Sequence, residues 1–207
     1  MDEFRRDDIT VSQGQTLDLQ TLSWTPRRHG RQLWQIGIPD RTAKEFRHGN
    51  DYRHWGLWLQ YPKDFPNDVN FIIGQSHERT DWNYAQVNVG QGKNAIGTKW
   101  TVRFNLAAPP KRGTAVLSVA LAAATKADLE IAMNGRTICH ITTGHDSAMI
   151  RAGIHGQYSL TPIHFDATLL KKGMNQLTLT QRANGNIQKC VMYDCLRLEV
   201  DEDSTAK

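Results

Sequence analysis

The segment TKWTVRFNL, residues 98–106, decides the fold class, because its apolar and polar side chains alternate with a period of two. Side chains of a β-strand point alternately to the two faces of its sheet. This segment therefore predicts a strand with one buried and one exposed face. The buried face would hold Trp100, Val102, Phe104 and Leu106.

The same alternation recurs on both sides of this segment. QLTLTQR, residues 176–182, repeats it, and LEIAMNGRTICHI, residues 129–141, predicts two strands around Asn134-Gly135, a pair that tolerates the positive φ of a tight hairpin turn. Further strands are expected at 54–60, 69–74, 84–89, 114–124, 156–166 and 191–200. Short strands separated by Gly, Pro, Asn and Asp predict an all-β, antiparallel sandwich.

Two segments allow a helix. The alanine-rich LSVALAAAT, residues 117–125, is compatible with a helix, but its β-branched residues and strand neighbours favour a strand. A short helical piece is expected around Ser147 to Arg151. No internal repeat is apparent.

Length and charge limit the class of protein. The 207 residues, 39% of them hydrophobic, suit one domain with a small appendage. We expect remnant strands of a preceding β domain and a linker at 1–30, a sandwich at 31–202 and a disordered tail at 203–207. A net charge of +4 without long basic runs predicts no nucleic-acid partner. No apolar run approaches the roughly 18 residues of a membrane helix.

The N-terminal MDEFRRDDIT lacks the apolar core of a signal peptide, so the chain is either intracellular or an internal fragment. Three cysteines are present. Cys190 and Cys195 are too far apart on one strand to bond to each other. We expect three buried thiols, with a disulfide from Cys139 to either of the others as the alternative.

Aromatic residues form two motifs that suit sugar binding. In RHWGLWLQYP, residues 53–62, alternation places Trp55 in the core and Trp58 among polar neighbours, free to meet a sugar, a second domain or a covering loop. In DWNYAQV, residues 81–87, Trp82 and Tyr84 are candidate platforms, since aromatic rings stack on pyranose faces. The alternative places one of these two rings in the core.

The densest polar motif is HDSAMIRAGIHGQY, residues 145–158. We predict that it binds sugar hydroxyls and carboxylates; docking on a neighbouring domain and purely local structure are the alternatives. Arg151 is the sharpest candidate, because a guanidinium matches a uronate carboxylate. The other candidates of this motif are Asp146, His155 and Tyr158. Outside it, Arg41 is expected to pair with Asp40 or to form an anion site.

Asp194 has an unusual place in VMYDCLRLEV, residues 191–200, because it shares the parity of the apolar residues. A carboxylate that points inward needs partners. Hydrogen bonds from a loop are the favoured prediction, a structural calcium is the weaker one, and a bulge that turns the side chain outward is the third. No other metal site and no cofactor are predicted.

Five ordered motifs give the chain a family resemblance. LWQIGIPDRTAKEFRHG (33–49), DYRHWGLW (51–58) and the three motifs at 81–87, 145–158 and 191–200 resemble the third domain of rhamnogalacturonan lyases of polysaccharide lyase family 4. The resemblance implies a jelly-roll sandwich of the galactose-binding-like, carbohydrate-binding-module type. Residues 1–30 are similar to the last strands of that family's second, fibronectin-like domain.

The resemblance also implies a function. The parent enzyme would be secreted and would cleave rhamnogalacturonan I, the pectin backbone of alternating rhamnose and galacturonate, by β-elimination. That reaction needs a base and a cation for the developing charge. The family places them in its first domain, and no motif here matches them, so no catalytic residue is predicted.

The leading hypothesis is therefore a non-catalytic module that binds rhamnogalacturonan I or completes the substrate groove of the catalytic domain of the parent lyase. The first alternative is a purely structural domain that buttresses the lyase. A lyase active on its own is the third.

Overall fold

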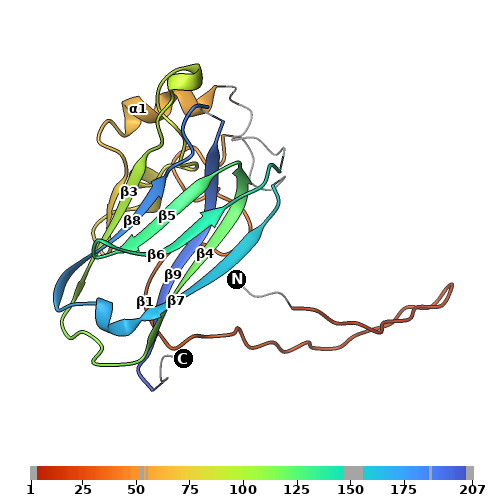
Figure 1. The fold of residues 1–207 in the computed structure, drawn as a ribbon. Helices are drawn as coiled ribbons and strands as arrows, with labels where there is room; N and C mark the ends of the chain where they lie inside the picture. The colour runs from red at the N-terminus through yellow and green to blue at the C-terminus, as the bar shows by residue number, and fades with distance from the viewer. Residues whose placement is uncertain (1–3, 52–53, 55, 147–155, 187, 204–207) are drawn as a thin grey trace.

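The fold of this computed structural model is a sandwich of two β-sheets, described for residues 4–51, 54, 56–146, 156–186 and 188–203 (Figure 1). One sheet has the strand order β1-β9-β4-β7 and the other has the order β2-β3-β8-β5-β6. All paired strands run antiparallel except β2 and β3, which are parallel. The predicted all-β sandwich is confirmed. Its strand pairs are antiparallel, as expected, except for the pair of β2 and β3.

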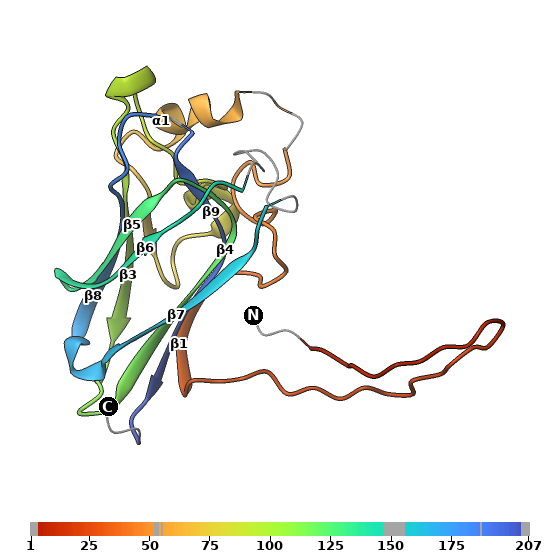
Figure 2. The same cartoon turned by 45° about the vertical axis from the view of Figure 1, so that its right-hand side comes forward.

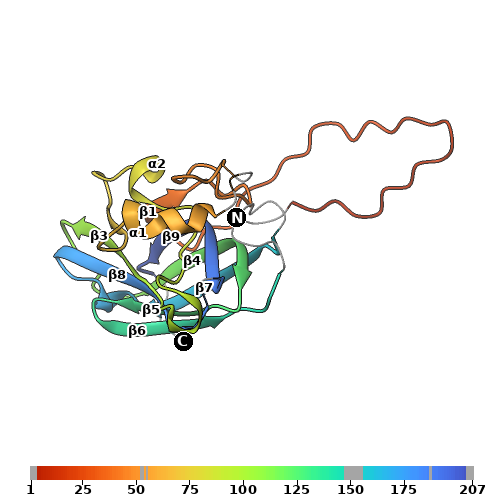
Figure 3. The same ribbon diagram turned by 90° about the horizontal axis from the view of Figure 1, so that it is seen from above.

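The strands of the two sheets have the following bounds. They are β1 (Arg31–Gly37), β2 (Asn70–Ile72), β3 (Lys99–Leu106), β4 (Thr114–Thr125), β5 (Asp128–Met133), β6 (Arg136–Thr142), β7 (Ser159–Asp166), β8 (Gly173–Gln181) and β9 (Cys190–Asp201). Short helices occupy some connections: η1 (Leu57–Gln60), α1 (Tyr61–Asp64), α2 (Glu78–Asp81), η2 (Gly92–Asn94) and η4 (Ala167–Leu169). Seen from above, α1 and α2 lie on the side of β1 and β3, away from β6 and β7 (Figure 3).

The core lies between the sheets and is richest in aromatic rings near the start of β3. Trp82 lies at its centre, with ring centroids 4.9 Å from Trp100 and 5.4 Å from Tyr193. The Trp100 indole N–H donates to the hydroxyl of Tyr61, and that hydroxyl donates to Asp68. Polar tips of buried aromatic residues usually find such partners, which fixes their orientation.

The alternating segments became the strands that the sequence predicts. The segment at 98–106 forms β3, and its face of Trp100, Val102 and Phe104 is buried. The Asn134-Gly135 turn joins β5 to β6, with φ of 50° and 85°. The alanine-rich segment lies in β4, a central strand buried on both faces, so strand pairing overrides its helical propensity.

Two expected strands are wrong, and one strand was not expected. Residues 57–60 form η1 instead of a strand, because Gly56 adopts a left-handed conformation with φ of 80° and turns the chain. Residues 84–89 make only isolated bridges, to Val191 and Ile96. The strand β1 was not among the expected strands. The helical piece predicted at 147–151 lies outside the described residues.

Residues 4–27 extend away from the sandwich as an arm, whereas Arg28 and His29 contact Glu199 and His164 of the sandwich (Figures 1 and 2). The described residues of the arm contain a turn at Ser12–Gln15 and no strand, so the remnant strands predicted there are absent from this structure. The proposed domain boundaries stay a prediction. All three cysteines are free thiols, with Cys190 and Cys195 buried and Cys139 half-buried. No helix among the described residues is long and apolar enough to cross a membrane.

Candidate functional site

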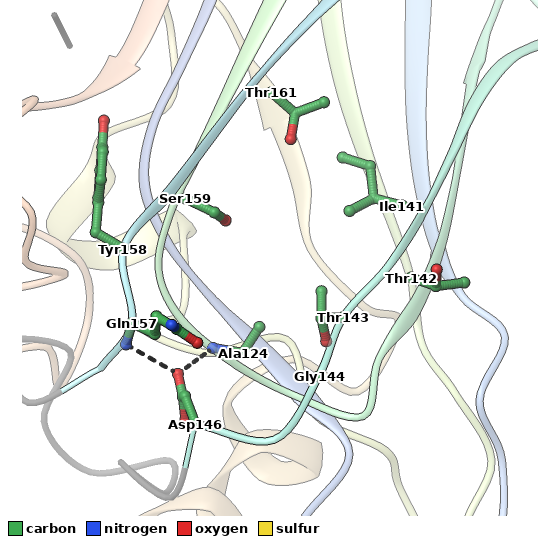
Figure 4. A pocket seen from close by; sticks show the side chains of 10 residues that line it. All are labelled: Ala124, Ile141, Thr142, Thr143, Gly144, Asp146, Gln157, Tyr158, Ser159 and Thr161. Carbon is green, nitrogen blue, oxygen red and sulfur yellow. Dashed lines mark hydrogen bonds between the residues drawn. The ribbon is translucent and has the colours of Figure 1, made fainter.

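A cavity of about 410 Å³ opens between β6 and β7, the edge strands of the two sheets (Figure 4). Within the described structure neither strand has a further partner on this side, so the sandwich is open here. Pockets of about 300–1,000 Å³ are the usual size for small ligands. The cavity is lined by Ala124, Ile141, Thr142, Thr143, Gly144, Asp146, Gln157, Tyr158, Ser159 and Thr161.

Strand alternation and backbone hydrogen bonds position this lining. Ser159 and Thr161 share the parity of Ile163, which faces the core, so their hydroxyls point into the opening between the sheets. On the other wall, Thr143 is fixed by two bonds to Ala127: its N–H donates to the Ala127 carbonyl at 3.0 Å, and its hydroxyl accepts from the Ala127 N–H at 3.0 Å. These bonds join this wall to Ala127, the residue before β5.

Asp146 closes the end of the cavity. Its Oδ2 oxygen accepts from the backbone N–H of Ala124 at 2.8 Å and of Gln157 at 3.3 Å (Figure 4). These bonds join the end of β4 to the residues that lead into β7. The preceding residue, His145, forms a bridge with Thr125, which continues the same connection. The carboxylate is thus held in place by the backbone of two separate segments.

The chemistry of this lining suits a polyhydroxylated ligand. Each Ser or Thr hydroxyl donates one hydrogen bond and accepts others, and the Gln157 amide does both. Ile141 and Ala124 supply an apolar wall. A sugar ring presents this combination of hydroxyl groups and C–H faces. No titratable pair in the described lining suits acid–base catalysis, because Asp146 is its one ionisable carboxyl or amine group.

The two aromatic residues of DWNYAQV are not a sugar platform. Trp82 is 0% exposed and Tyr84 is 1% exposed. This segment threads between the backbone of Arg47, which bonds to residues 82 and 84, and that of Val191 in β9, which bonds to Gln86. Because it is covered on both sides, both rings fill the core. The prediction that they stack on sugar is corrected.

The prediction that Trp58 lies among polar neighbours, opposite the core, is also corrected. The alternation that placed it opposite the core requires an extended strand, but residues 57–60 form η1. In a 3₁₀ turn the side chains do not alternate between two faces, and Trp58 is 7% exposed and belongs to the core. Its partner in the prediction, Trp55, lies outside the described residues.

The structure brings three of the predicted site residues, Asp146, Tyr158 and Arg41, near one another. Asp146 lines the cavity, as does the backbone region of Tyr158. The Tyr158 ring points away from the cavity in Figure 4, and the guanidinium of Arg41 lies 4.9 Å from its centroid. Arg41 thus contacts the Tyr158 ring and is not among the residues that line the cavity. Arg151 and His155 lie outside the described residues.

Asp194 has the loop partners that were the favoured prediction. It is the extra residue of a β-bulge, since Cys195 pairs with Ala120 and Tyr193 pairs with Leu121. The bulge breaks the parity that placed Asp194 with the apolar residues. Its Oδ1 oxygen accepts from the N–H groups of Asp40 at 3.0 Å and Arg41 at 2.8 Å.

Burial raises the pKa of Asp194 to about 6. The two backbone donors oppose this shift, but the loss of solvent is the larger effect. Among the described residues, no group of three His, Cys, Asp or Glu side chains is placed to hold a metal ion. Asp194 therefore stabilises the 38–41 loop through these two hydrogen bonds.

Sequence reasoning missed the hydroxyl residues of the cavity. Thr142 ends the hairpin strand β6 and Thr143 follows it, and Ser159 and Thr161 lie at the start of β7. Hydroxyl residues at strand ends are ordinary in sequence, and only the topology shows that β6 and β7 face each other. The available signal was their position on both sides of the HDSAMIRAGIHGQY motif.

A second cavity, of about 480 Å³, lies at the same end of the sandwich beside α1 and the start of β3. It is lined by Pro62, Phe65, Pro66, Asn67, Asp68, Val89, Ile96, Gly97 and Thr98. Its one carboxylate, Asp68, already accepts from the hydroxyl of Tyr61 and from the N–H of Lys99. With fewer hydroxyl groups and a committed carboxylate, this cavity offers a sugar less than the β6–β7 cavity does.

A family model described as the CBM-like domain III of polysaccharide lyase family 4 matches residues 32–198. The chain belongs to this family. The resemblance read from the five motifs is thereby confirmed, and so is the carbohydrate-binding-module-like class of its sandwich.

Curated relatives agree with this family. The rhamnogalacturonate lyase of Dickeya dadantii is 30% identical and aligns with 80% of this chain, and rhamnogalacturonate lyase B of Emericella nidulans is 27% identical and aligns with 96%. The matched parts are 27% and 37% of those relatives. The chain thus spans well under half the length of the curated relatives it matches. A solved family 35 carbohydrate-binding module from an environmental isolate is 17% identical, with a TM-score of 0.35 over 57% of this chain and 82% of that one.

Proposed function

We propose that this domain is the non-catalytic glycan-binding module of a secreted rhamnogalacturonan lyase that degrades pectin, and that it binds rhamnogalacturonan I in the β6–β7 cavity. The observation that supports this most is the hydroxyl-lined opening between the two edge strands of a CBM-like sandwich. Its position matters because β6 and β7 are edge strands, so a ligand can reach the cavity from solvent. The substrate itself is carried over from the names of the relatives.

Binding by the module alone is expected to be weak. A single sugar-sized cavity buries little area, and ordering the ligand has a cost in entropy. The module would increase the residence of a catalytic domain on its polymer through effective concentration, without contributing any reacting group. No catalytic residue is assigned to this chain.

Isothermal titration with rhamnogalacturonan I oligosaccharides tests the proposal. Replacing Ser159 with Ala and Thr161 with Val removes two cavity hydroxyls while keeping the side chains close to their original shape. About 1 kcal/mol lost per hydrogen bond predicts a roughly tenfold or greater loss of affinity for the double variant. Thr137→Val is the matched control, since Thr137 is exposed on β6 and does not line the cavity. Absence of heat for the original chain at millimolar ligand would end the proposal.

The second candidate function is structural, and the arm favours it. Residues 4–24 expose large apolar side chains that nothing in the sandwich covers: Phe4, Ile9, Val11, Leu17, Leu22 and Trp24. We propose that they belong to a preceding β domain of the longer protein, which would bury them. In that protein, buttressing predicts a Tm several degrees above that of the separate module. Equal Tm values together with measurable glycan binding would favour the binding module.

A further inference from the structure

We propose that the outer face of β2, β3 and β8 is a second binding surface, which takes an acidic glycan and binds a uronate carboxylate through Arg103. This inference goes beyond the proposed function, because none of these three strands lines the β6–β7 cavity. The two sites are independent, so either can be present without the other.

Strand pairing places four polar side chains together on this face. In an antiparallel pair, side chains directly opposite each other lie on the same face of the sheet. Arg103 of β3 lies opposite Gln176 of β8, and Thr101 lies opposite Thr178 (Figure 1). The β3 residues of the other parity are buried in the core, so these four side chains lie on the outer side of the sheet.

The charge of this face has one sign. The strands β2, β3 and β8 contain no Asp or Glu, and their two cations, Lys99 and Arg103, share the outer face of β3. Acidic residues of the same sheet are on β5, where Glu130 is bonded to Arg182. Asp68 lies beside the backbone of Lys99, and its carboxylate is already bonded. An anion on the outer face of β3 therefore meets two cations and no carboxylate from these three strands.

Arg103 has donors that no described residue uses. Among the residues that the structure describes, no hydrogen bond or ion pair involves its side chain. The side chain is nevertheless half-buried, beside Ile72 of β2 and Gln176 of β8 in the strand register. Arginines that leave solvent are usually paired, because a guanidinium carries five N–H donors. The donors of Arg103 are therefore free to bind a ligand that lies on this face.

The neutral neighbours of Arg103 favour a glycan among the possible anions. A guanidinium binds a planar carboxylate through two parallel hydrogen bonds. The Thr101 hydroxyl and the Gln176 amide each donate and accept, as sugar hydroxyls do. A nucleic acid would need a longer row of cations, because its affinity comes from many phosphate contacts with Lys and Arg. One guanidinium among hydroxyl and amide groups instead matches a sugar chain that carries a carboxylate.

Two tetrasaccharides of equal length test the surface, one of D-galacturonate and one of neutral D-galactose. We would titrate each into the ¹⁵N-labelled chain at neutral pH and low salt, and follow the amides of Thr101, Arg103 and Gln176. Because a hydrogen bond to a charged group is stronger than a neutral one, the galacturonate chain is expected to bind about tenfold more tightly at these amides. Equal affinities would overturn the inference.

Sodium acetate is the third titrant, since it offers a carboxylate without a sugar. It is expected to shift the same three amides only at a concentration well above that of the galacturonate chain, because it makes no contact with the hydroxyl and amide neighbours. Acetate that binds as tightly as the tetrasaccharide would make this face a general anion contact, and the glycan assignment would be wrong.

Arg103→Gln removes the charge and is expected to weaken galacturonate binding about tenfold. Arg103→Lys keeps the charge but loses the two parallel donors, so a smaller loss of about threefold is expected. The control is Arg6→Gln, which changes the net charge by the same amount on the exposed arm and should leave the affinity unchanged. Unchanged affinity of Arg103→Gln would contradict the inference. If that variant does not fold, salt gives the second test: galacturonate affinity of the original chain should fall as ionic strength rises, and a salt-independent affinity would contradict the carboxylate contact.

Different amides report on this face and on the β6–β7 cavity. If the galacturonate tetrasaccharide leaves the amides of β3 and β8 unmoved, this inference is overturned, whatever happens in the cavity. If rhamnogalacturonan I oligosaccharides leave the amides of Gly144 and Gln157 unmoved, the proposed function fails, and a response of β3 and β8 to galacturonate would still support this surface.

Discussion

The aromatic part of the core and the β6–β7 cavity lie at the same end of the sandwich and differ in almost every property. The first contains Trp82, Trp100 and Tyr193, all fully buried and in ring contact with one another. The second contains small hydroxyl residues, one carboxylate and no aromatic ring that points inward. In this protein the aromatic residues pack the core between the sheets, and small polar residues line the cavity.

The largest effect is expected from Trp82→Ala. Removing a fully buried indole that packs against four other aromatic rings leaves a large void, and such losses cost about 3–5 kcal/mol of the free energy of unfolding. Urea denaturation followed by circular dichroism measures it. A variant of unchanged stability that has lost glycan affinity would reverse the roles assigned to the two regions.

The bulge at Asp194 is polar yet belongs with the residues that hold the fold, and it predicts a pH dependence of stability. Burial raises the pKa of Asp194 from 3.8 to about 6, so the folded chain keeps a proton that the unfolded chain releases between these values. Stability therefore falls as the pH rises through this window, by up to about 3 kcal/mol. Beyond the upper pKa the loss is complete.

Asp194→Asn removes this titration and keeps an acceptor for the N–H groups of residues 40 and 41. Denaturation of both chains between pH 4 and 7 checks the prediction: the stability of the original chain should decline relative to that of the variant as the pH rises. A difference that is independent of pH would show that Asp194 is not a buried, proton-binding carboxyl.

A smaller loss is expected from Tyr193→Phe. The Tyr193 hydroxyl donates to Gln86 at 2.6 Å, and both residues are buried. Removing the donor leaves the Gln86 oxygen without that bond, which costs about 1–3 kcal/mol. Glycan affinity should not change, because the pair lies in the core and not in the cavity. An affinity change larger than the change in folded fraction would place the aromatic region in the binding site.

The smallest effect on stability is expected at the cavity. Thr142 is exposed at its rim, so Thr142→Val should change the free energy of unfolding by no more than about 0.5 kcal/mol. It should still weaken rhamnogalacturonan I binding severalfold, since a lost hydrogen bond is worth about 1 kcal/mol. Thermal unfolding and calorimetric titration of the same preparation give both numbers. A destabilisation of several kcal/mol would make Thr142 a structural residue.

The sequence was sufficient for the fold because alternation is a local property. The residues of 98–106, 129–141 and 176–182 set their own buried faces before any partner is known. The sequence did not predict whether the aromatic motifs are buried, because their burial depends on the segments that pack over them. Trp82 and Tyr84 are buried by the segments of Arg47 and Val191, which are distant in sequence.

The candidate site was partly predictable, because some of its residues lie in one continuous motif. Asp146 and Tyr158 were found because they belong to a dense polar motif, but that motif gave no sign that the Tyr158 ring points away from the cavity. The hydroxyls became a site only because β6 and β7 are edge strands that face each other. The bulge at Asp194, which inverts the parity of β9, likewise depends on pairing with β4.

The central claim is that glycan binds in the β6–β7 cavity and not on the aromatic residues. A ¹⁵N titration of this chain with rhamnogalacturonan I oligosaccharides tests it most directly, because amides and indoles are observed in one spectrum. We predict that the amides of Gly144, Gln157 and Ser159 shift progressively while the indole N–H signals of Trp82 and Trp100 do not move. Shifts of those indole signals with unmoved cavity amides would contradict the account.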